Sequence, residues 1–248
     1  MTATGTTKSP RRSSARGNYA TLLGLLKAHP GKGPVLDCPC GQGALAQMLL
    51  AEGFSDLEVA DYTPGLYLLP APRPVRADLN GRLPWPDGHF EVAICADGMS
   101  DIGFQRNAIA EFHRILRPGG ALLISLPNVL NFRSRLRFLF TGFMNKFRRP
   151  LDELHGQSTT RPVPWWELRY MLVREGFEIT TLTCNRVKPA EALAAPLLLL
   201  TVPALLWNLV SGSRKGDDAP YWNDVHRELN SLPVLFGESL IIAARRKA

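Results

Sequence analysis

Hydrophobic residues in this chain gather in short runs that alternate with segments of helical spacing. Seven runs have the length and composition of buried strands: residues 35–37, 57–61, 75–79, 90–97, 120–126, 177–184 and 238–245. Four segments repeat apolar residues at the spacing of helices: residues 19–28, 44–53, 107–116 and 165–175. This alternation predicts one α/β domain, and the chain length suits one such domain.

A glycine-containing turn joins the first predicted strand to the helix that follows it. The strand ends at Asp37, the turn contains Gly41 and Gly43, and the helix starts near Ala44. Glycine lets the backbone come close to a ligand, and a helix N-terminus favours an anionic group. The pattern predicts a nucleotide-binding cradle, with an ordinary strand-to-helix turn that needs a positive φ as the alternative.

Acidic residues recur where the predicted strands end. Asp61 ends the second strand, Asp78 lies at the end of the third, and Asp97 ends the fourth. Open α/β sheets bind ligands at the carboxyl ends of their strands, and an acid at the end of the second strand is placed to hold a ribose diol. We therefore expect a shared site at this edge; the alternative is that each acid is an ordinary turn carboxylate.

Several stretches have the order and spacing of a known family: residues 35–37, 41–43, 77–79, 83–91 and 112–120, together with Asp61. With them the chain resembles the class I S-adenosylmethionine-dependent methyltransferases of the small-molecule type. The resemblance covers most of residues 18–185 and the last strand. It implies an α/β, Rossmann-like, seven-stranded doubly wound sheet with an antiparallel last strand, and S-adenosyl-L-methionine as the cofactor.

Two positions depart from the family pattern. Pro39 replaces the first glycine of the loop, which stiffens the turn and removes a backbone donor. After the fourth strand, residues 97–101 read Asp-Gly-Met-Ser-Asp, where the family commonly has Glu-x-x-Glu-His. The catalytic histidine that the family would place at Asp101 is therefore missing.

The resemblance implies a role for each cofactor residue. Asp37 would order the loop and the methionine ammonium, Asp61 would hold the ribose, and Asp78 with Leu79 would meet the adenine. The residues expected at the cofactor are Asp37, Cys40, Gly41, Gly43, Asp61, Tyr62, Asp78, Leu79 and Asp97.

The catalytic base is open between two residues. His155 lies past a basic stretch, where related enzymes often carry a substrate-side histidine, and Asp101 lies at the mouth of the fourth strand. A lone histidine is also a common surface or packing residue. A phenol or carboxylate acceptor would need little help from a base.

Positive charge is concentrated in two segments. Residues 1–17 hold four basic residues and residues 131–149 hold six, with no acid in either, so the rest of this +7 chain is slightly acidic. Residues 1–17 lack periodicity and a secretory apolar core, and we expect a disordered basic tail on a cytoplasmic protein. The four cysteines lack the spacing of a zinc site, so we expect reduced thiols and no metal.

Two insertions distinguish residues 18–248 from a minimal methyltransferase domain. A cap insertion at residues 131–164 begins with an amphipathic stretch of phenylalanines and arginines. A hydrophobic insertion at residues 188–236 contains the uncharged run 192–210, which Pro196 and Pro203 interrupt. We expect a hairpin in the membrane interface; the alternatives are a helix packed on protein and a true membrane span.

These observations predict an S-adenosylmethionine-dependent methyltransferase. The acceptor is expected to be a small molecule, a lipid or a lipid-linked compound, methylated on oxygen at the cytoplasmic membrane face. One alternative is a nucleic-acid methyltransferase, which the basic segments favour; residues 97–100 lack the usual Asp/Asn-Pro-Pro-aromatic signature. Another is a non-catalytic cofactor-binding protein that partners a membrane component.

Overall fold

A computed structural model describes residues 9–11, 13–145, 147, 161–188 and 219–247 of the chain. Its centre is a seven-stranded sheet in the order β3-β2-β1-β4-β5-β7-β6, in which only β7 runs antiparallel to its neighbours. The strands are β1 Val35–Asp37, β2 Leu57–Asp61, β3 Val75–Arg76, β4 Phe90–Ala96, β5 Leu116–Pro127, β6 Phe177–Cys184 and β7 Ser239–Arg246. The predicted fold class is confirmed.

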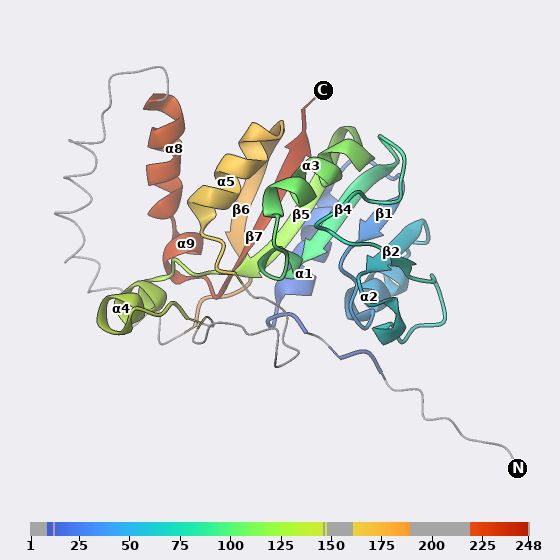
Figure 1. Cartoon of the computed structure of the whole chain (residues 1–248), viewed down its shortest axis with the longest axis horizontal. Coiled ribbons are helices and arrows are strands. Elements are labelled where there is room, and N and C mark those ends of the chain that lie inside the picture. The colour runs from blue at the N-terminus through green and yellow to red at the C-terminus, as the bar shows by residue number, and fades with distance from the viewer. Residues whose placement is uncertain (1–8, 12, 146, 148–160, 189–218, 248) are drawn as a thin grey trace, which may run out of the picture.

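Helices cover both faces of the sheet (Figure 1). Alternate strand residues point to opposite faces, so the sheet supports two apolar cores. One core joins the strands to α3 and α5, and the other joins them to α1 and α2. The described helices are α1 Asn18–Ala28, α2 Ala44–Ala51, α3 Gln105–Ile115, α4 Phe132–Thr141, α5 Trp165–Arg174, α8 Ala219–Leu229 and α9 Leu232–Phe236, with short 3₁₀ turns η1 Pro64–Leu66 and η2 Gly98–Ser100.

Two strands differ in length from their prediction by more than one residue. The third strand was expected over 75–79, but β3 ends at Arg76. The strand stops there because a turn follows it. In this turn the Asp78 carboxylate accepts hydrogen bonds from the backbone and side-chain nitrogens of Asn80. The fifth strand starts earlier than expected, at Leu116, because this residue already pairs with Phe90 of β4.

The two predicted insertions are described in part. The cap insertion contributes α4, and the hydrophobic insertion contributes α8 and α9, whereas the apolar run 192–210 lies outside the described residues. Helix α8 is tied to α5 because Glu228 accepts hydrogen bonds from Arg169 at 2.8 Å and Trp165 at 3.0 Å. None of the helices in the described parts of the chain is long and apolar enough to cross a bilayer.

Candidate functional site

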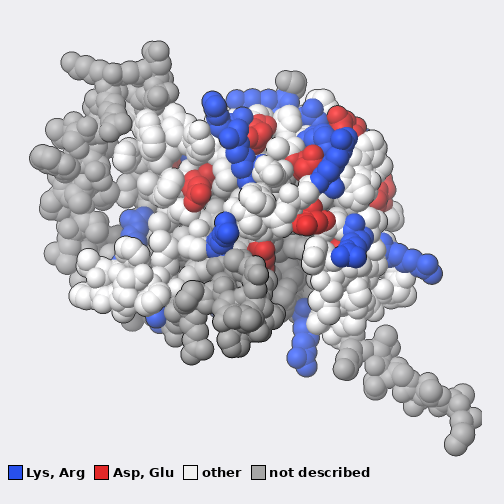
Figure 2. Space-filling model, in the orientation of Figure 1, with Lys and Arg blue, Asp and Glu red and all other residues white. Residues whose placement is uncertain are grey.

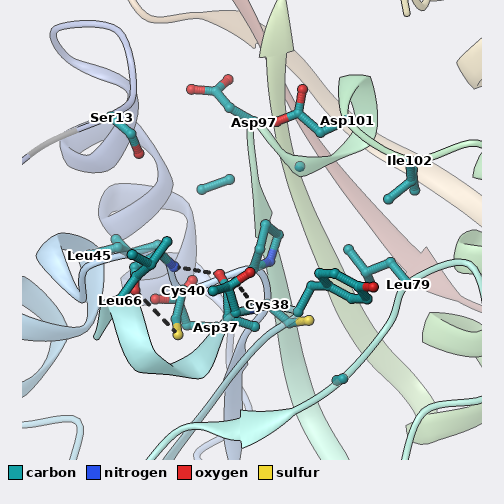
Figure 3. A pocket seen from close by; sticks show the side chains of 18 of the residues that line it. Ser13, Asp37, Cys38, Cys40, Leu45, Leu66, Leu79, Asp97, Asp101 and Ile102 are labelled. Atoms are coloured by element: carbon teal, nitrogen blue, oxygen red, sulfur yellow. Dashed lines mark hydrogen bonds between the residues drawn. The ribbon is translucent and has the colours of Figure 1, made fainter. Parts of the chain in front are cut away.

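A cavity of about 650 Å³ lies at the carboxyl ends of β1, β2 and β4. Strands β1 and β4 are neighbours in the sheet, but β2 and β3 lie on the other side of β1. The connections therefore turn in opposite directions from β1, and such switch points leave the crevice where α/β sheets bind ligands. Figure 3 shows Ser13, Asp97 and Asp101 along one side of this cavity, with Asp37 and Cys40 on the other.

Most of the predicted site residues line this one cavity. The residues it contains from that set are Asp37, Cys40, Gly41, Asp61, Tyr62, Asp78, Leu79, Asp97 and Asp101. Gly43 belongs to the same loop but does not line the cavity, and His155 lies outside the described residues. Asp37, Asp61, Asp78 and Asp97, which end or closely follow four strands, thus lie together at one edge of the sheet.

Asp37 is the most unusual group in the cavity. Its side chain is 1% exposed, and neither carboxylate oxygen has a hydrogen-bond partner among the described residues. Burial, and then the nearby charge of Asp61, raise the pKa of Asp37 to about 8. A buried carboxyl group without a partner is costly, so this position favours a ligand that donates hydrogen bonds or carries positive charge.

Asp61 fixes the loop from the neighbouring strand. Its two carboxylate oxygens accept hydrogen bonds from the backbone nitrogens of Gly41 and Thr63, both at 2.8 Å. Each oxygen has a further lone pair that can accept a ligand hydroxyl. Asp61 therefore orients the loop and lines the cavity at the same time.

The two glycines of the loop have different surroundings. Gly41 has a φ of +51°, and a Cβ built there would meet no atom within 4 Å, because the residue faces the cavity. Gly43 has a φ of +91°, and a Cβ there would lie 2.7 Å from the Tyr67 ring. Gly41 thus leaves space for a ligand, whereas Gly43 leaves space for a neighbouring side chain.

Pro39 also has a structural partner in this loop. A Cβ on Gly98 would overlap the Pro39 ring, so the first loop and the turn after β4 are in close contact. Both residues line the cavity. The proline that departs from the family pattern therefore packs against a residue whose lack of a side chain makes room for it.

Asp97 follows the last residue of β4 and has an unusual backbone conformation. Its φ is +59°, and it is the only non-glycine residue with positive φ in the described parts of the chain. Its carboxyl group accepts hydrogen bonds from the Ser125 hydroxyl at 3.2 Å and from the Asn18 amide at 3.2 and 3.3 Å, and the Ser14 hydroxyl also donates to it. Donors from β5, α1 and the N-terminal segment converge on this one side chain.

The cysteines are unsuited to nucleophilic chemistry. Burial raises the pKa of the Cys40 thiol, and the charges of Asp37 and Asp61 raise it further. Burial also raises the pKa values of Cys38 and Cys95. Since the thiolate is the reactive form, these side chains act as small apolar residues, and Cys38 and Cys40 line the cavity.

Some of the lining residues were not predicted from the sequence. They are Ser13, Tyr19, Leu66 and Ile102, among others. Tyr19 was assigned to a helix and Ser13 to a tail without periodicity, whereas Ile102 was assigned to no element. Only tertiary packing brings them to the cavity, because no local pattern marks them.

The cavity has the features needed for S-adenosylmethionine. Asp37 can meet an ammonium group, Asp61 can meet a ribose diol, and Leu79 with Ile102 supplies apolar walls for an adenine ring. The unpartnered Asp37 carboxyl and the open space at Gly41 both support this fit.

Comparisons with known proteins point to methyltransferases. A methyltransferase domain family matches residues 36–124. A ubiquinone/menaquinone biosynthesis C-methyltransferase UbiE of Stutzerimonas stutzeri is 42% identical over 86 residues, 35% of this chain and 31% of that protein. Methyltransferase-like protein 27 of Homo sapiens is 34% identical over 111 residues, 42% of this chain and 44% of that protein. The chain thus spans less than half the length of these relatives.

Solved structures show the same fold over nearly the whole chain. A S-adenosylmethionine-dependent methyltransferase of Mesorhizobium loti has a TM-score of 0.55 at 16% identity, covering 94% of this chain and 99% of that one. The [4+2]-cyclase SpnF has a TM-score of 0.57 at 17% identity, covering 97% and 85%. Residues 36–124 thus belong to a methyltransferase domain family, and the order of the seven strands is that of the class I S-adenosylmethionine-dependent methyltransferase fold.

Proposed function

We propose that this protein transfers the methyl group of S-adenosylmethionine to a small-molecule acceptor that has a lipid or lipid-linked part. The observation that carries the proposal is the buried Asp37, whose carboxyl group has no partner among the described residues, beside the open Gly41 loop and the cavity-lining Asp61. This arrangement suits a ligand with an ammonium group and a ribose, and the family match to a methyltransferase domain points to the same ligand.

The residues of the chain would align the reactants and exclude water. When bound, the cofactor supplies an electrophilic methyl group on a sulfonium, and methyl transfer is an in-line displacement that needs a precisely placed nucleophile. The cofactor would be held by Asp37, Gly41 and Asp61. The acceptor would enter at the side of the cavity where Asp97 and Asp101 lie.

An oxygen nucleophile on the acceptor is the first candidate. Asp101 is exposed and lines the cavity, so its carboxylate is placed to accept a hydroxyl proton as the oxygen attacks. His155 is the second candidate for this role and stays a sequence-based proposal. Carbon methylation of a quinone precursor is a second candidate reaction, because the similar UbiE protein is named for C-methylation in quinone biosynthesis.

The surface of α4 supports an acceptor that comes from a lipid layer. Phe138, Leu139 and Phe140 are 52%, 73% and 79% exposed, and Arg133 lies exposed on the same helix. Figure 2 shows this region, at the lower left, as a surface with few charged side chains. A helix with exposed aromatic and basic residues suits the lipid head-group level, so we propose a peripheral position at the cytoplasmic membrane face.

The orientation of α4 is fixed by the protein. The Arg135 guanidinium donates hydrogen bonds to the carbonyl oxygens of Leu130 at 2.7 Å and Leu229 at 3.1 Å. Asn131 caps the first turn by accepting from the Ser134 backbone nitrogen at 2.8 Å. These bonds hold one side of α4 to the domain and leave the apolar residues Phe138, Leu139 and Phe140 exposed.

Methyl transfer from labelled cofactor tests the proposed activity. The full chain is incubated with S-adenosylmethionine carrying a labelled methyl group and with either the lipid extract or the aqueous extract of the cells that make it. We expect label in the lipid fraction, and the bond type of the product identifies oxygen or carbon as the acceptor atom. Label only in nucleic acid would favour the alternative enzyme, and binding without transfer to any fraction would favour a non-catalytic role.

A further inference from the structure

The segment before α1 runs along the open side of the cavity. Ser13 and Tyr19 both line the cavity. Figure 3 shows Ser13 on the same side as Asp97 and Asp101. We call residues 13–17 the N-terminal strap. It is part of the expected tail 1–17, yet it has defined partners in the site.

Ser14 joins the strap to the end of β4. Its hydroxyl donates a hydrogen bond to the Asp97 carboxyl group, and it accepts one from the Asn18 amide at 2.8 Å. Asn18 is fully buried, and the same amide nitrogen also lies 3.2 and 3.3 Å from the two Asp97 oxygens. Hydrogen bonds therefore connect Ser14 of the strap with the side chains of Asn18 and Asp97.

Two further hydrogen bonds fix the segment at its ends. Just before the strap, the Arg11 backbone nitrogen donates to Gln42 of the cofactor loop at 3.0 Å. At the other end, the Arg16 carbonyl oxygen accepts from the Asn185 side chain at 3.0 Å. Gly17, with a φ of +94°, then turns the chain into α1. The segment thus reaches from the glycine loop to the end of β6.

We propose that the N-terminal strap closes over the bound cofactor and that Ser14 is the latch that holds it to Asp97. This inference rests on the proposed function. The strap is held by a few hydrogen bonds at partly exposed positions, and such segments open more easily than the packed sheet. Opening would admit and release the cofactor, and closure would keep water from the reacting groups. Ser14 is a positioning residue, because it acts through Asp97.

The dissociation rate of S-adenosylhomocysteine tests the latch. Stopped-flow displacement by excess S-adenosylmethionine is followed for the wild type, Ser14→Ala, Ser14→Thr and a chain that starts at Gly17. We expect dissociation to be about tenfold faster in Ser14→Ala, because the hydrogen bond from the Ser14 hydroxyl to the Asp97 carboxyl group is lost. Dissociation should be faster still in the shortened chain, which lacks most of the strap. Ser14→Thr keeps a hydroxyl and should stay near the wild-type rate. Ser9→Ala, an exposed serine outside the strap, is the matched control.

Trypsin supplies a second readout on the unmodified chain. Cleavage after Arg16 should slow when S-adenosylhomocysteine is bound, because closure of the strap covers this bond. Unchanged dissociation in both Ser14→Ala and the shortened chain would overturn the strap while leaving cofactor binding intact. A wild-type protein that does not bind S-adenosylhomocysteine would instead overturn the proposed function.

Discussion

At the scale of single residues, two aspartates in the cavity differ in how they are held. Asp61 accepts backbone hydrogen bonds from Gly41 and Thr63, whereas Asp37 is buried with no partner among the described residues. Asp61 therefore has a structural role even without a ligand. We expect Asp37 to gain a partner when a ligand binds, so the two residues should respond differently to mutation and to pH.

Asp61→Ala should weaken binding of S-adenosylhomocysteine by about 1.5–3 kcal/mol, which is roughly tenfold or more. The mutation removes an acceptor for the ribose diol and also releases the Gly41 nitrogen that orients the loop. Isothermal titration calorimetry measures the change. Asp56→Ala removes an exposed aspartate just before the same strand and serves as the control. Equal affinities in both variants would contradict the ribose role of Asp61.

Asp37 makes stability depend on pH in the ligand-free protein. Its pKa is raised to about 8 in the fold, against about 3.9 in an unfolded chain, so the folded state keeps a proton that the unfolded state releases. The contribution of this group to the free energy of unfolding should therefore fall as the pH rises from about 4 toward 8. Denaturant unfolding of the wild type and Asp37→Asn across this range measures the difference. A constant difference would contradict the raised pKa.

At the scale of elements, the loop between β1 and α2 leaves open space in the cavity at Gly41. Gly41→Val should reduce cofactor affinity by more than about thirtyfold, because the new side chain would occupy the cavity. Gly53→Val is a matched control: Gly53 also has positive φ and open space around its Cβ, and it lies outside the cavity. Both variants should lose similar stability in thermal unfolding. If both lose affinity alike, backbone strain rather than lost space would be the cause.

Helix α4 should bind to lipid through its exposed residues. Replacing Phe138, Leu139 and Phe140 with serine removes most of the apolar area that α4 exposes, so sedimentation with anionic phosphatidylserine liposomes should fall several-fold. High salt should weaken the wild-type binding only in part, because it screens the arginines and not the apolar contact. The matched control replaces Trp166, Tyr170 and Val173 on the exposed face of α5 with serine. Equal loss in both variants would contradict a specific role for α4.

At the scale of the whole molecule, periodicity in the sequence predicts the sheet well. The bounds of β1, β2 and β6 agree with the prediction, since short apolar runs between turns determine where buried strands lie. The acids at strand ends likewise predict where the cavity lies. The N-terminal strap had no such pattern, because its place depends on hydrogen bonds to Asp97, Gln42 and Asn185, which are distant in sequence. Local patterns do not record partners of this kind.

Calorimetric titration of the full chain with S-adenosylmethionine and S-adenosylhomocysteine tests the central claim most directly. We expect one binding site per chain for both ligands, and a marked loss of affinity in Gly41→Val, if the cavity at the ends of β1, β2 and β4 is the cofactor site. Absence of binding heat and of any thermal stabilisation by either ligand, in a folded wild-type protein, would contradict it.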